Sequence, residues 1–509
     1  MPKRSLTARL LTGGFALGLS VYCLAYPGGS AAAPLRVRAD QGGAVQDGLS
    51  WKTSFRTIQQ AIDAAGTSGE IWIAAGSYQE RLTLPAGVSL YGGFAGTESA
   101  RAERNVTRLT LVDAQQIDRP LTVAEGAGPD TVVDGLTLAK GYPHSAEGAL
   151  GIGGAVYLVN ASPTIQNVSF RLNTAIYGGA IYCRGGSPRI ANCVFDHASA
   201  EYGGAVYIEN GSPALVNSTF FRAGTYTSNT SAGAVYITGA ASKPAIVNNL
   251  ILRGEGVMMD AANPGEPVIR NNCLYGVPAP FIGMPSRIGQ DGNISAAPQV
   301  ASETLPNFHL QPTSPCRDRG NNTVIAPDDR DMDGAPRAPD GAVDIGADEA
   351  DGTLWSLHPA ALHVALDGND FNDGLTWGSP MRTLAEAVRK AAPGDEVWVR
   401  EGVYEAAVSA YVYSGVGVYG GFAGTETMRS QRDPARHPVV LSAGLYGTAA
   451  INLSSTDDKA VVDGFTIQGR PGQEGRGVGF HDSKGTLRNC TIRDFIYLTG
   501  YATALSISG

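Results

Sequence analysis

The strongest constraint on the fold is a short repeat in the middle of the chain. SPTIQNVSF (162–170), SPRIANCVF (187–195) and SPALVNSTF (212–220) recur every 25 residues, with looser versions at 243–251 and 266–275. A short unit of strands without a helix cannot bury its own apolar face, but stacked units can, because equivalent strands pair into continuous parallel sheets. The repeat therefore predicts an all-β stack of coils, a β-solenoid.

One asparagine falls at the same point of each coil. These residues are Asn167, Asn192, Asn217, Asn248 and Asn271. Asparagine tolerates unusual backbone angles at turns and can hydrogen-bond its own copy in a stacked neighbour. We therefore expect a turn at each position and a ladder of asparagine contacts along the stack.

A second, longer repeat duplicates the start of the stack. LYGGFAGTE (90–98) returns as VYGGFAGTE (418–426), and the segments 46–65 and 372–391 also match, with Trp51 at the place of Trp377. In each copy a stretch with helical spacing precedes an alternating strand. Such a helix suits a plug over the first coil, whose sheet edges would otherwise stay open. Two such starts predict two solenoids, the second incomplete.

These residues resemble bacterial secreted right-handed parallel β-helix proteins of the pectate-lyase-like superfamily. The helix-plus-YGGFAGTE cassette, followed by Arg432 and Asp433 in the second copy, is similar to the N-terminal part of such proteins. DRDMDGAPRAPDGAVDIGADE (329–349) looks like the closing segment seen where a choice-of-anchor surface region follows. The resemblance implies the fold, whereas the superfamily includes lyases, hydrolases, adhesins and other surface proteins.

The predicted division of the chain follows from these repeats. A basic start (Lys3, Arg4, Arg9), a short apolar stretch and small residues give a signal peptide over 1–33, with no membrane span after it. The first β-helix with its cap occupies 34–290, its closing segment 291–350, a linker 351–361, and the second, truncated β-helix 362–509. We expect a monomer, extracellular or at the cell surface.

Charge and cysteine content exclude several classes of protein. The net charge of −9, without a basic run outside the N-terminus, excludes nucleic acid as an expected partner. Five cysteines follow the signal, without any C-x-x-C pair, so most are expected to be small buried apolar residues. They are Cys183, Cys193, Cys273, Cys316 and Cys490.

Strand alternation predicts a stripe of tyrosines on the first β-helix. In GGAVYL, GGAIYC, GGAVYI and GAVYIT the aliphatic residues belong inside, so the pleat turns the tyrosines outward. The predicted stripe consists of Tyr157, Tyr182, Tyr207 and Tyr236. Their faces could stack on the rings of an extended polysaccharide, or they could stack on one another and stabilise the sheet. The second copy has Gly479 and Ser506 instead.

Four residues after the asparagine turns are the candidates for catalysis. A polysaccharide lyase needs a cation to neutralise a uronate and a base to remove the neighbouring proton. Arg171 or Arg222 could be the base, and Asp196, beside His197, could help to hold calcium. The alternative is an ion-pair ladder on the surface, since calcium sites usually need several carboxylates.

The closing segment contains a candidate calcium loop. Asp329, Asp331 and Asp333 followed by Gly334 have the spacing of such a loop, with Asp340 at the twelfth position. The flanking helices of an EF-hand are missing, and a solvated turn is the alternative.

The favoured function is a non-catalytic secreted or cell-surface protein that binds a polysaccharide or another extracellular surface along an extended face. The first alternative is a polysaccharide lyase or another carbohydrate-active enzyme, and the second is a structural spacer. Fold alone does not choose among these functions.

Overall fold

The structure is a computed structural model of the 509-residue chain. It describes residues 33–144, 151–225, 233–303, 307–338, 341–355, 360–406, 408–443, 449–454, 456–470, 476–495 and 503–508. The predicted signal peptide therefore lies almost wholly outside the described residues.

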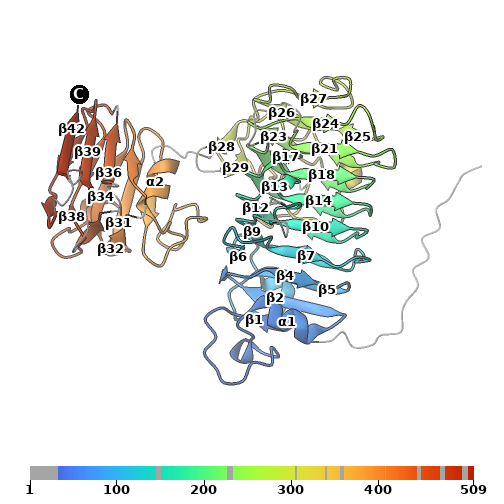
Figure 1. Ribbon diagram of the computed structural model, residues 1–509, viewed down its shortest axis with the longest axis horizontal. Coiled ribbons are helices and arrows are strands. Elements are labelled where there is room, and N and C mark those ends of the chain that lie inside the picture. The colour runs from blue at the N-terminus through green and yellow to red at the C-terminus, as the bar shows by residue number, and fades with distance from the viewer. Residues whose placement is uncertain are drawn as a thin grey trace, which may run out of the picture.

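The first β-helix consists of three parallel sheets, to each of which a coil contributes one strand (Figure 1). Sheet 1 contains β1 (Leu35–Val37), β2 (Gly69–Ala74), β5 (Val88–Phe94), β8 (Val132–Asp134), β11 (Thr164–Gln166), β15 (Arg189–Ala191), β19 (Ala214–Val216), β22 (Ala245–Val247) and β25 (Val268–Arg270). Sheet 2 contains β3 (Gly76–Tyr78), β6 (Thr110–Asp113), β9 (Thr137–Ala139), β12 (Ser169–Arg171), β16 (Val194–Asp196), β20 (Thr219–Phe221), β23 (Leu250–Leu252) and β26 (Cys273–Tyr275). Sheet 3 contains β4 (Leu82–Leu84), β7 (Leu121–Val123), β10 (Val156–Val159), β14 (Ile181–Arg184), β18 (Val206–Glu209), β21 (Val235–Thr238), β24 (Val257–Met259) and β27 (Phe281–Ile282).

Two small sheets flank this stack. Strands β13 (Thr174–Tyr177) and β17 (Ser199–Tyr202) pair in parallel between sheets 2 and 3. Strands β28 (Val300–Ser302) and β29 (Asn307–Leu310) pair antiparallel after the last coil, and the 3-10 turn η3 (Asn322–Val324) follows.

The later part of the chain forms a second, shorter β-helix with the same cycle of strands. Its first sheet contains β30 (Ala361–Val364), β31 (Glu396–Arg400), β34 (Gly417–Phe422), β37 (Val461–Asp463) and β40 (Thr486–Arg488). The second contains β32 (Gly402–Glu405), β35 (Val439–Ser442), β38 (Phe465–Gln468) and β41 (Thr491–Arg493). The third contains β33 (Ala410–Val412), β36 (Ala449–Ser454), β39 (Arg476–His481) and β42 (Thr503–Ser508).

Each stack begins with a short helix, as predicted. Thr57 caps α1 (Ile58–Ala65) in a capping box with Gln60, and the helix buries Ile58, Ala61 and Ile62 against the first coil. Thr383 caps α2 (Leu384–Lys390), which buries Leu384, Ala387 and Val388 in the same way. The 3-10 turn η1 (Trp51–Thr53) precedes α1, and η2 (Arg101–Glu103) and η4 (Arg429–Gln431) follow the two YGGF strands. None of the helices in the described parts of the chain is long and apolar enough to cross a bilayer.

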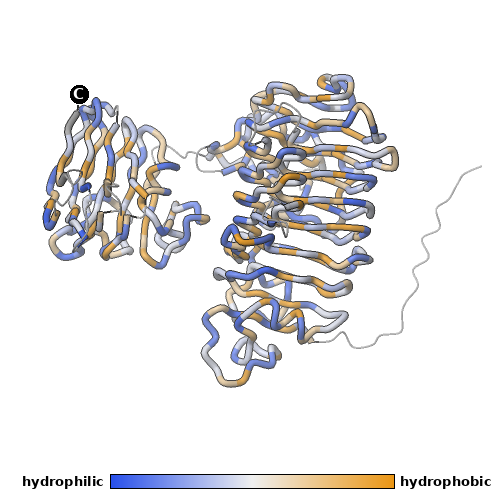
Figure 2. The backbone as a smooth tube through the Cα atoms, in the orientation of Figure 1, coloured by the Kyte–Doolittle hydropathy of each residue, from blue (hydrophilic) through white to orange (hydrophobic). Residues whose placement is uncertain are grey.

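The core lies inside the coils, where inward side chains stack in rows. Phe170, Phe195 and Phe220 pack face to face with ring centroids 4.7 and 4.4 Å apart. Figure 2 shows the resulting alternation of apolar and polar residues along the strands. Of the five cysteines, four are buried and Cys490 is partly exposed, in agreement with their expected apolar role.

The asparagine turns are present, but the hydrogen-bonded ladder lies one residue later than predicted. All five predicted asparagines have φ between 49° and 59°, the left-handed region that asparagine tolerates. Only one hydrogen bond connects two of them, from Asn248 Nδ2 to Asn217 Oδ1 at 2.8 Å. The continuous ladder consists of the buried Asn249, Asn272 and Asn293. The residue after each turn asparagine points into the coil. An asparagine at that position has a buried side-chain amide, which needs a hydrogen-bond partner inside the coil.

Candidate functional site

Four tyrosines lie one above the next on the outer side of sheet 3. Tyr157, Tyr182, Tyr207 and Tyr236 occupy the same register position of β10, β14, β18 and β21. Their rings stack with centroids 5.7, 5.4 and 5.3 Å apart and interplanar angles of 7°, 6° and 5°. The structure thus brings the predicted stripe together.

A second row of tyrosines, which the sequence analysis missed, lies beside the stripe. Tyr177 on β13 and Tyr202 on β17 stack at 5.3 Å. Tyr177 meets Tyr207 edge to face at 5.0 Å, and Tyr202 meets Tyr236 at 5.5 Å. The signal was present in the sequence, because each of the two precedes a Gly-Gly pair (177–179 and 202–204). We call the six residues the tyrosine array.

The array presents ring edges and hydroxyl groups, not free faces. Each stripe ring covers the face of its neighbour, and Tyr182 and Tyr236 are only 6% and 8% exposed. The Arg119 guanidinium lies 4.9 Å from the Tyr157 centroid and covers the first ring of the row. Ring faces are therefore used within the protein, as in the alternative that the tyrosines stack on one another and stabilise the sheet.

The hydroxyl groups of Tyr182, Tyr207 and Tyr236 remain protonated at neutral pH. Burial raises the pKa of Tyr236 to about 12, and it raises the pKa of Tyr182 and Tyr207 as well. The Tyr182 hydroxyl donates a hydrogen bond to Glu209 at 2.7 Å. A row of neutral hydroxyls can donate to and accept from a polyhydroxylated ligand.

The second β-helix has a different surface at these positions. Tyr411, Asn452, Gly479 and Ser506 share one register position across β33, β36, β39 and β42. The stripe is therefore confined to the first β-helix, as the sequence predicts.

The four catalytic candidates do lie together, but as a chain of ion pairs and hydrogen bonds within the protein. Arg171 Nε lies 3.1 Å from Asp196 Oδ2, and His197 Nδ1 lies 2.5 Å from Asp196 Oδ1. Arg222 follows, with one guanidinium nitrogen 3.5 Å from His197 Nε2. Burial raises the pKa of Asp196, but hydrogen bonds and charges from His197 and Arg171 outweigh it and lower the pKa. This arrangement matches the ion-pair ladder considered as the alternative to catalysis.

Arg171 also contacts the second β-helix. Its guanidinium donates to the Phe371 carbonyl at 2.6 Å and lies 4.9 Å from the Phe371 ring centroid. The Lys140 ammonium lies 5.2 Å from the same centroid. The predicted base is thus occupied on both sides by partners within the chain.

The three predicted calcium ligands that the structure describes, Asp329, Asp331 and Asp333, do not converge on one point. Asp329 forms an ion pair with Arg189 on β15. The Oδ1 atom of Asp331 accepts hydrogen bonds from the backbone N–H groups of Asp333 (3.0 Å) and Ala335 (2.8 Å) in a hairpin turn. In the part of the chain that the structure describes, the only predicted ligand in a group able to hold a metal is Asp333. The fourth, Asp340, lies outside the described residues.

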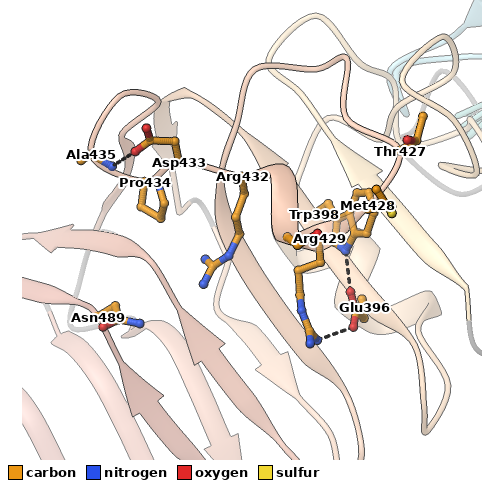
Figure 3. Close-up of a pocket in the computed structure, with 11 residues that line it drawn as sticks. Glu396, Trp398, Thr427, Met428, Arg429, Arg432, Asp433, Pro434, Ala435 and Asn489 are labelled. Atoms are coloured by element: carbon orange, nitrogen blue, oxygen red, sulfur yellow. Dashed lines mark hydrogen bonds and ion pairs between the residues drawn. The ribbon is translucent and has the colours of Figure 1, made fainter.

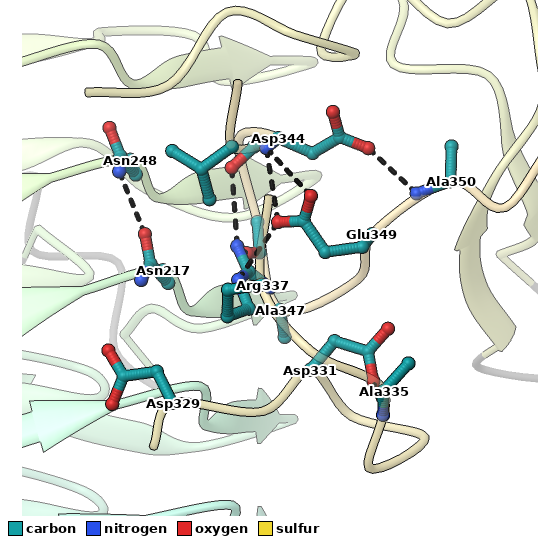
Figure 4. A network of polar contacts seen from close by, with 12 residues as sticks. Asn217, Asn248, Asp329, Asp331, Ala335, Arg337, Asp344, Ala347, Glu349 and Ala350 are labelled. Atoms are coloured by element: carbon teal, nitrogen blue, oxygen red, sulfur yellow. Dashed lines mark hydrogen bonds and ion pairs between the residues drawn. The ribbon is translucent and has the colours of Figure 1, made fainter. Parts of the chain in front are cut away.

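A buried arginine organises the closing segment instead (Figure 4). The Arg337 side chain is fully buried, and its Nε lies 2.9 Å from Glu349 Oε1. Its terminal nitrogen donates to the carbonyl oxygens of Asp344 (3.3 Å) and Gly346 (2.9 Å). Burial raises the pKa of Glu349 to about 7, although the charge of Arg337 opposes the rise. The motif that resembles a closing segment is therefore a packed plug against the side of the stack.

A cavity of about 970 Å³ lies on the side of the second β-helix (Figure 3). Its lining includes Glu396, Trp398, Arg429 and Arg432. Arg429 Nη1 lies 2.5 Å from Glu396 Oε1, and Arg432 Nη2 lies 2.7 Å from Asp463 Oδ2. Both guanidinium groups are neutralised, so the cavity is polar without a free cationic centre.

The first β-helix has the same wall. Arg101 pairs with Glu70 at 2.7 Å, and Arg104 pairs with Asp134 at 2.6 Å. In each copy the first arginine also lies over a tyrosine, at 4.5 Å for Tyr91 and 4.6 Å for Tyr419. Repetition of these contacts in both cassettes, including the Arg432 singled out by the resemblance, indicates that they hold the coils together.

Comparison with known proteins finds likeness only among solved structures. No family model and no curated protein matches the chain. Pectin methylesterase from Aspergillus niger is 18% identical with a TM-score of 0.31, over 53% of this chain and 87% of that chain. Pectate lyase Pel9A is 13% identical with a TM-score of 0.33, over 63% and 97%. PfbA, a surface adhesin of Streptococcus pneumoniae, is 14% identical with a TM-score of 0.23, over 89% and 88%. At these values the likenesses carry no argument about function.

The strand pairing decides the architecture. The chain is a right-handed parallel β-helix protein. Among the described residues of this β-helix protein, the array offers hydroxyls at regular spacing, whereas the charged candidates already have partners.

Proposed function

We propose that this β-helix protein is secreted or held at the cell surface, and that it binds an extracellular polysaccharide or another extended surface without transforming it. The tyrosine array of the first β-helix is the contact. The observation that carries the proposal is the regular alignment of aromatic edges and hydroxyls from successive coils.

The spacing of the array supports an elongated ligand. Equivalent side chains repeat once per coil in exact strand register, so each step along the axis offers the same contact again. Weak contacts that repeat along one linear ligand add to useful affinity when the ligand can engage several at once. Exposed ring edges beside hydroxyl donors are suited to the mixed apolar and polar surface of a sugar.

The proposed export fits an extracellular ligand. The basic start, apolar stretch and small residues of 1–33 are typical of a signal peptide, and a signal peptide directs the chain that follows it out of the cytoplasm. Polysaccharides and surface components are the extended ligands available there.

A polysaccharide panel separates this function from its two alternatives. The purified full chain would be run by affinity electrophoresis through gels containing neutral or uronate polymers, and mixed with the same polymers in an absorbance assay for unsaturated sugars, with and without calcium. We expect retention without product. Unsaturated product would overturn the proposal in favour of a lyase, and its loss on Arg171→Ala or Arg222→Ala would locate the base. The absence of both retention and product would contradict binding and would leave the structural spacer as the remaining function.

A further inference from the structure

A histidine and two aspartates meet where β29 lies against the closing segment. One nitrogen of His309 and one carboxylate oxygen each of Asp333 and Asp348 lie within 4.8 Å of one another. They come from two separated segments of the chain, and only Asp333 belongs to the calcium set predicted from the sequence. Imidazole and carboxylate groups at this spacing are a common ligand set for divalent transition metals.

Both ring nitrogens of His309 face hydrogen-bond acceptors. Its Nδ1 contacts Asn307 Oδ1, and the same oxygen accepts the His309 backbone N–H at 3.2 Å. Its Nε2 lies 2.7 Å from Asp333 Oδ2. Both neighbours are acceptors, but a neutral imidazole has a single N–H to donate. The 2.7 Å contact is a direct hydrogen bond, and a metal ion on Nε2 would replace its proton once the carboxylate oxygen moved outward to make room.

Asp348, the third member of the group, is buried. It is 2% exposed, and its Oδ2 accepts one hydrogen bond, from the Leu310 backbone N–H at 2.6 Å. A buried carboxylate is stable as an anion only when paired or bound to a metal. A divalent ion shared with His309 and Asp333 would be such a partner.

The surroundings hold the three ligands in place. The His309 ring stacks on Trp355 with centroids 4.1 Å apart. Trp355 is held in turn by Gln311, which bonds both its backbone N–H and its carbonyl oxygen at 3.1 and 2.8 Å. A hydrogen bond on the second nitrogen of a ligating histidine, here to Asn307, is the usual support of a metal ligand.

We propose that His309, Asp333 and Asp348 bind a divalent transition-metal ion such as Zn²⁺ or Mn²⁺. Nε2 of the histidine and one oxygen of each aspartate are the protein ligands. An imidazole ligand favours these ions over calcium, which prefers oxygen alone. The ion links β29 to the closing segment and stabilises the end of the first β-helix. This site is independent of the polysaccharide surface proposed above.

The test is metal binding by the full chain after removal of metals with a chelator. Equilibrium dialysis followed by metal analysis would be done with Zn²⁺, Mn²⁺, Ca²⁺ and Mg²⁺. We expect one Zn²⁺ or Mn²⁺ per chain, bound at least tenfold more tightly than Ca²⁺ or Mg²⁺, and a higher melting temperature of the first β-helix with the bound ion. His309→Ala and Asp348→Asn should abolish both effects. Absence of stoichiometric binding, or binding that both variants retain, would overturn the proposal.

Two controls separate a lost ligand from a lost fold. His437→Ala removes a histidine that also contacts a carboxylate, Glu401 at 2.8 Å, but lies on the second β-helix, and it should keep the metal. Asn at position 348 can still accept the Leu310 hydrogen bond, so the variant should melt normally in chelator. If a variant misfolds, the absorption spectrum of Co²⁺ bound to the wild-type chain tests the metal site without any variant. Absorption bands typical of a nitrogen and oxygen ligand set support the site, and the spectrum of free Co²⁺ contradicts it.

Discussion

At the scale of single residues, charged side chains join neighbouring coils instead of standing free for chemistry. Arg171 pairs with Asp196 one coil away, and Arg488 pairs with Asp463 in the second β-helix at 2.8 Å. A parallel stack places equivalent positions directly above one another, so opposite charges at one position make a contact between coils. Arg171 and Asp196 lie one 25-residue repeat apart in the sequence and share one register position of β12 and β16.

Replacing Asp196 by Asn should make the free energy of unfolding depend less on pH in the acidic range. The pKa of Asp196 is lowered in the folded protein, so its contribution is present above the pKa of an unfolded aspartate and is lost as pH falls through the folded value. We expect Asp196→Asn to reduce the free energy of unfolding by about 3 kcal/mol at pH 6 and by much less at pH 2.5. Urea denaturation at both pH values measures this. An equal loss at both values would contradict the assignment. Asp40→Asn, which breaks an exposed pair with Arg38, should change stability by about 1 kcal/mol or less.

Replacing Arg337 by Leu should destabilise the closing segment strongly. The guanidinium is fully buried beside Glu349, and removing it leaves a buried carboxylate without its partner. We expect a loss of about 3–5 kcal/mol in urea denaturation of the first β-helix. The double change Arg337→Leu with Glu349→Leu should restore most of that loss. If the double variant is as unstable as the single one, the pair does not act as described.

At the scale of elements, the repeat period predicts the coils well. The second row of tyrosines and the asparagine ladder depend on how the coils fold. Strand positions, capping helices and the tyrosine stripe follow from local spacing alone. The row of Tyr177 and Tyr202 could not be placed, because the Gly-Gly bend decides which outward rings meet. The hydrogen-bonded asparagine ladder lies one residue after the predicted one. Two coils contain an Asn-Asn pair, and only burial, which the sequence does not show, selects the second asparagine of each pair.

Replacing Asn272 by Ala should weaken the last coils of the first β-helix. Its Nδ2 donates to the Ile246 carbonyl at 2.9 Å and to Asn293 Oδ1 at 2.9 Å, and its Oδ1 accepts from Asn249. Each buried group left unpaired costs about 1–3 kcal/mol. We expect a loss of roughly 3 kcal/mol by urea denaturation. Asn263→Ala, at an exposed position, is the matched control and should have little effect. Equal losses in both variants would refute the ladder's role.

At the scale of the whole molecule, the loop around Phe371 contacts the first β-helix. The Lys390 ammonium, with the residue 1% exposed, donates to the Asp370 carbonyl at 2.9 Å and to the Asn372 carbonyl at 3.1 Å. It thereby fixes the loop that presents Phe371 to Arg171 and Lys140 of the first β-helix. The sequence predicts two β-helices. It does not predict their contact, because the side chains that make it do not occupy equivalent positions of any repeat.

Replacing Phe371 by Ala should loosen the two β-helices without unfolding either. Two cation–π contacts are lost, each worth about 0.5–2 kcal/mol. We expect a larger radius of gyration by small-angle X-ray scattering, with unchanged melting transitions. Tyr411→Ala, also on the second β-helix but 50% exposed, should leave the radius unchanged. An unchanged radius in Phe371→Ala would show that the loop does not join them.

The most direct test of the account is polysaccharide affinity with the array altered at its accessible ring edges. Tyr177 and Tyr202 are partly exposed and belong to the second row, so their joint replacement by Ser removes edge contacts while leaving the four stripe tyrosines in place. The joint replacement of Tyr411 and Tyr413 by Ser, both 50% exposed on the second β-helix, is the control. Against the polymer that retains the wild-type chain in affinity electrophoresis, we expect the first double variant to lose at least tenfold in affinity and the control to bind normally. Equal retention of both variants would contradict a binding surface on the tyrosine array.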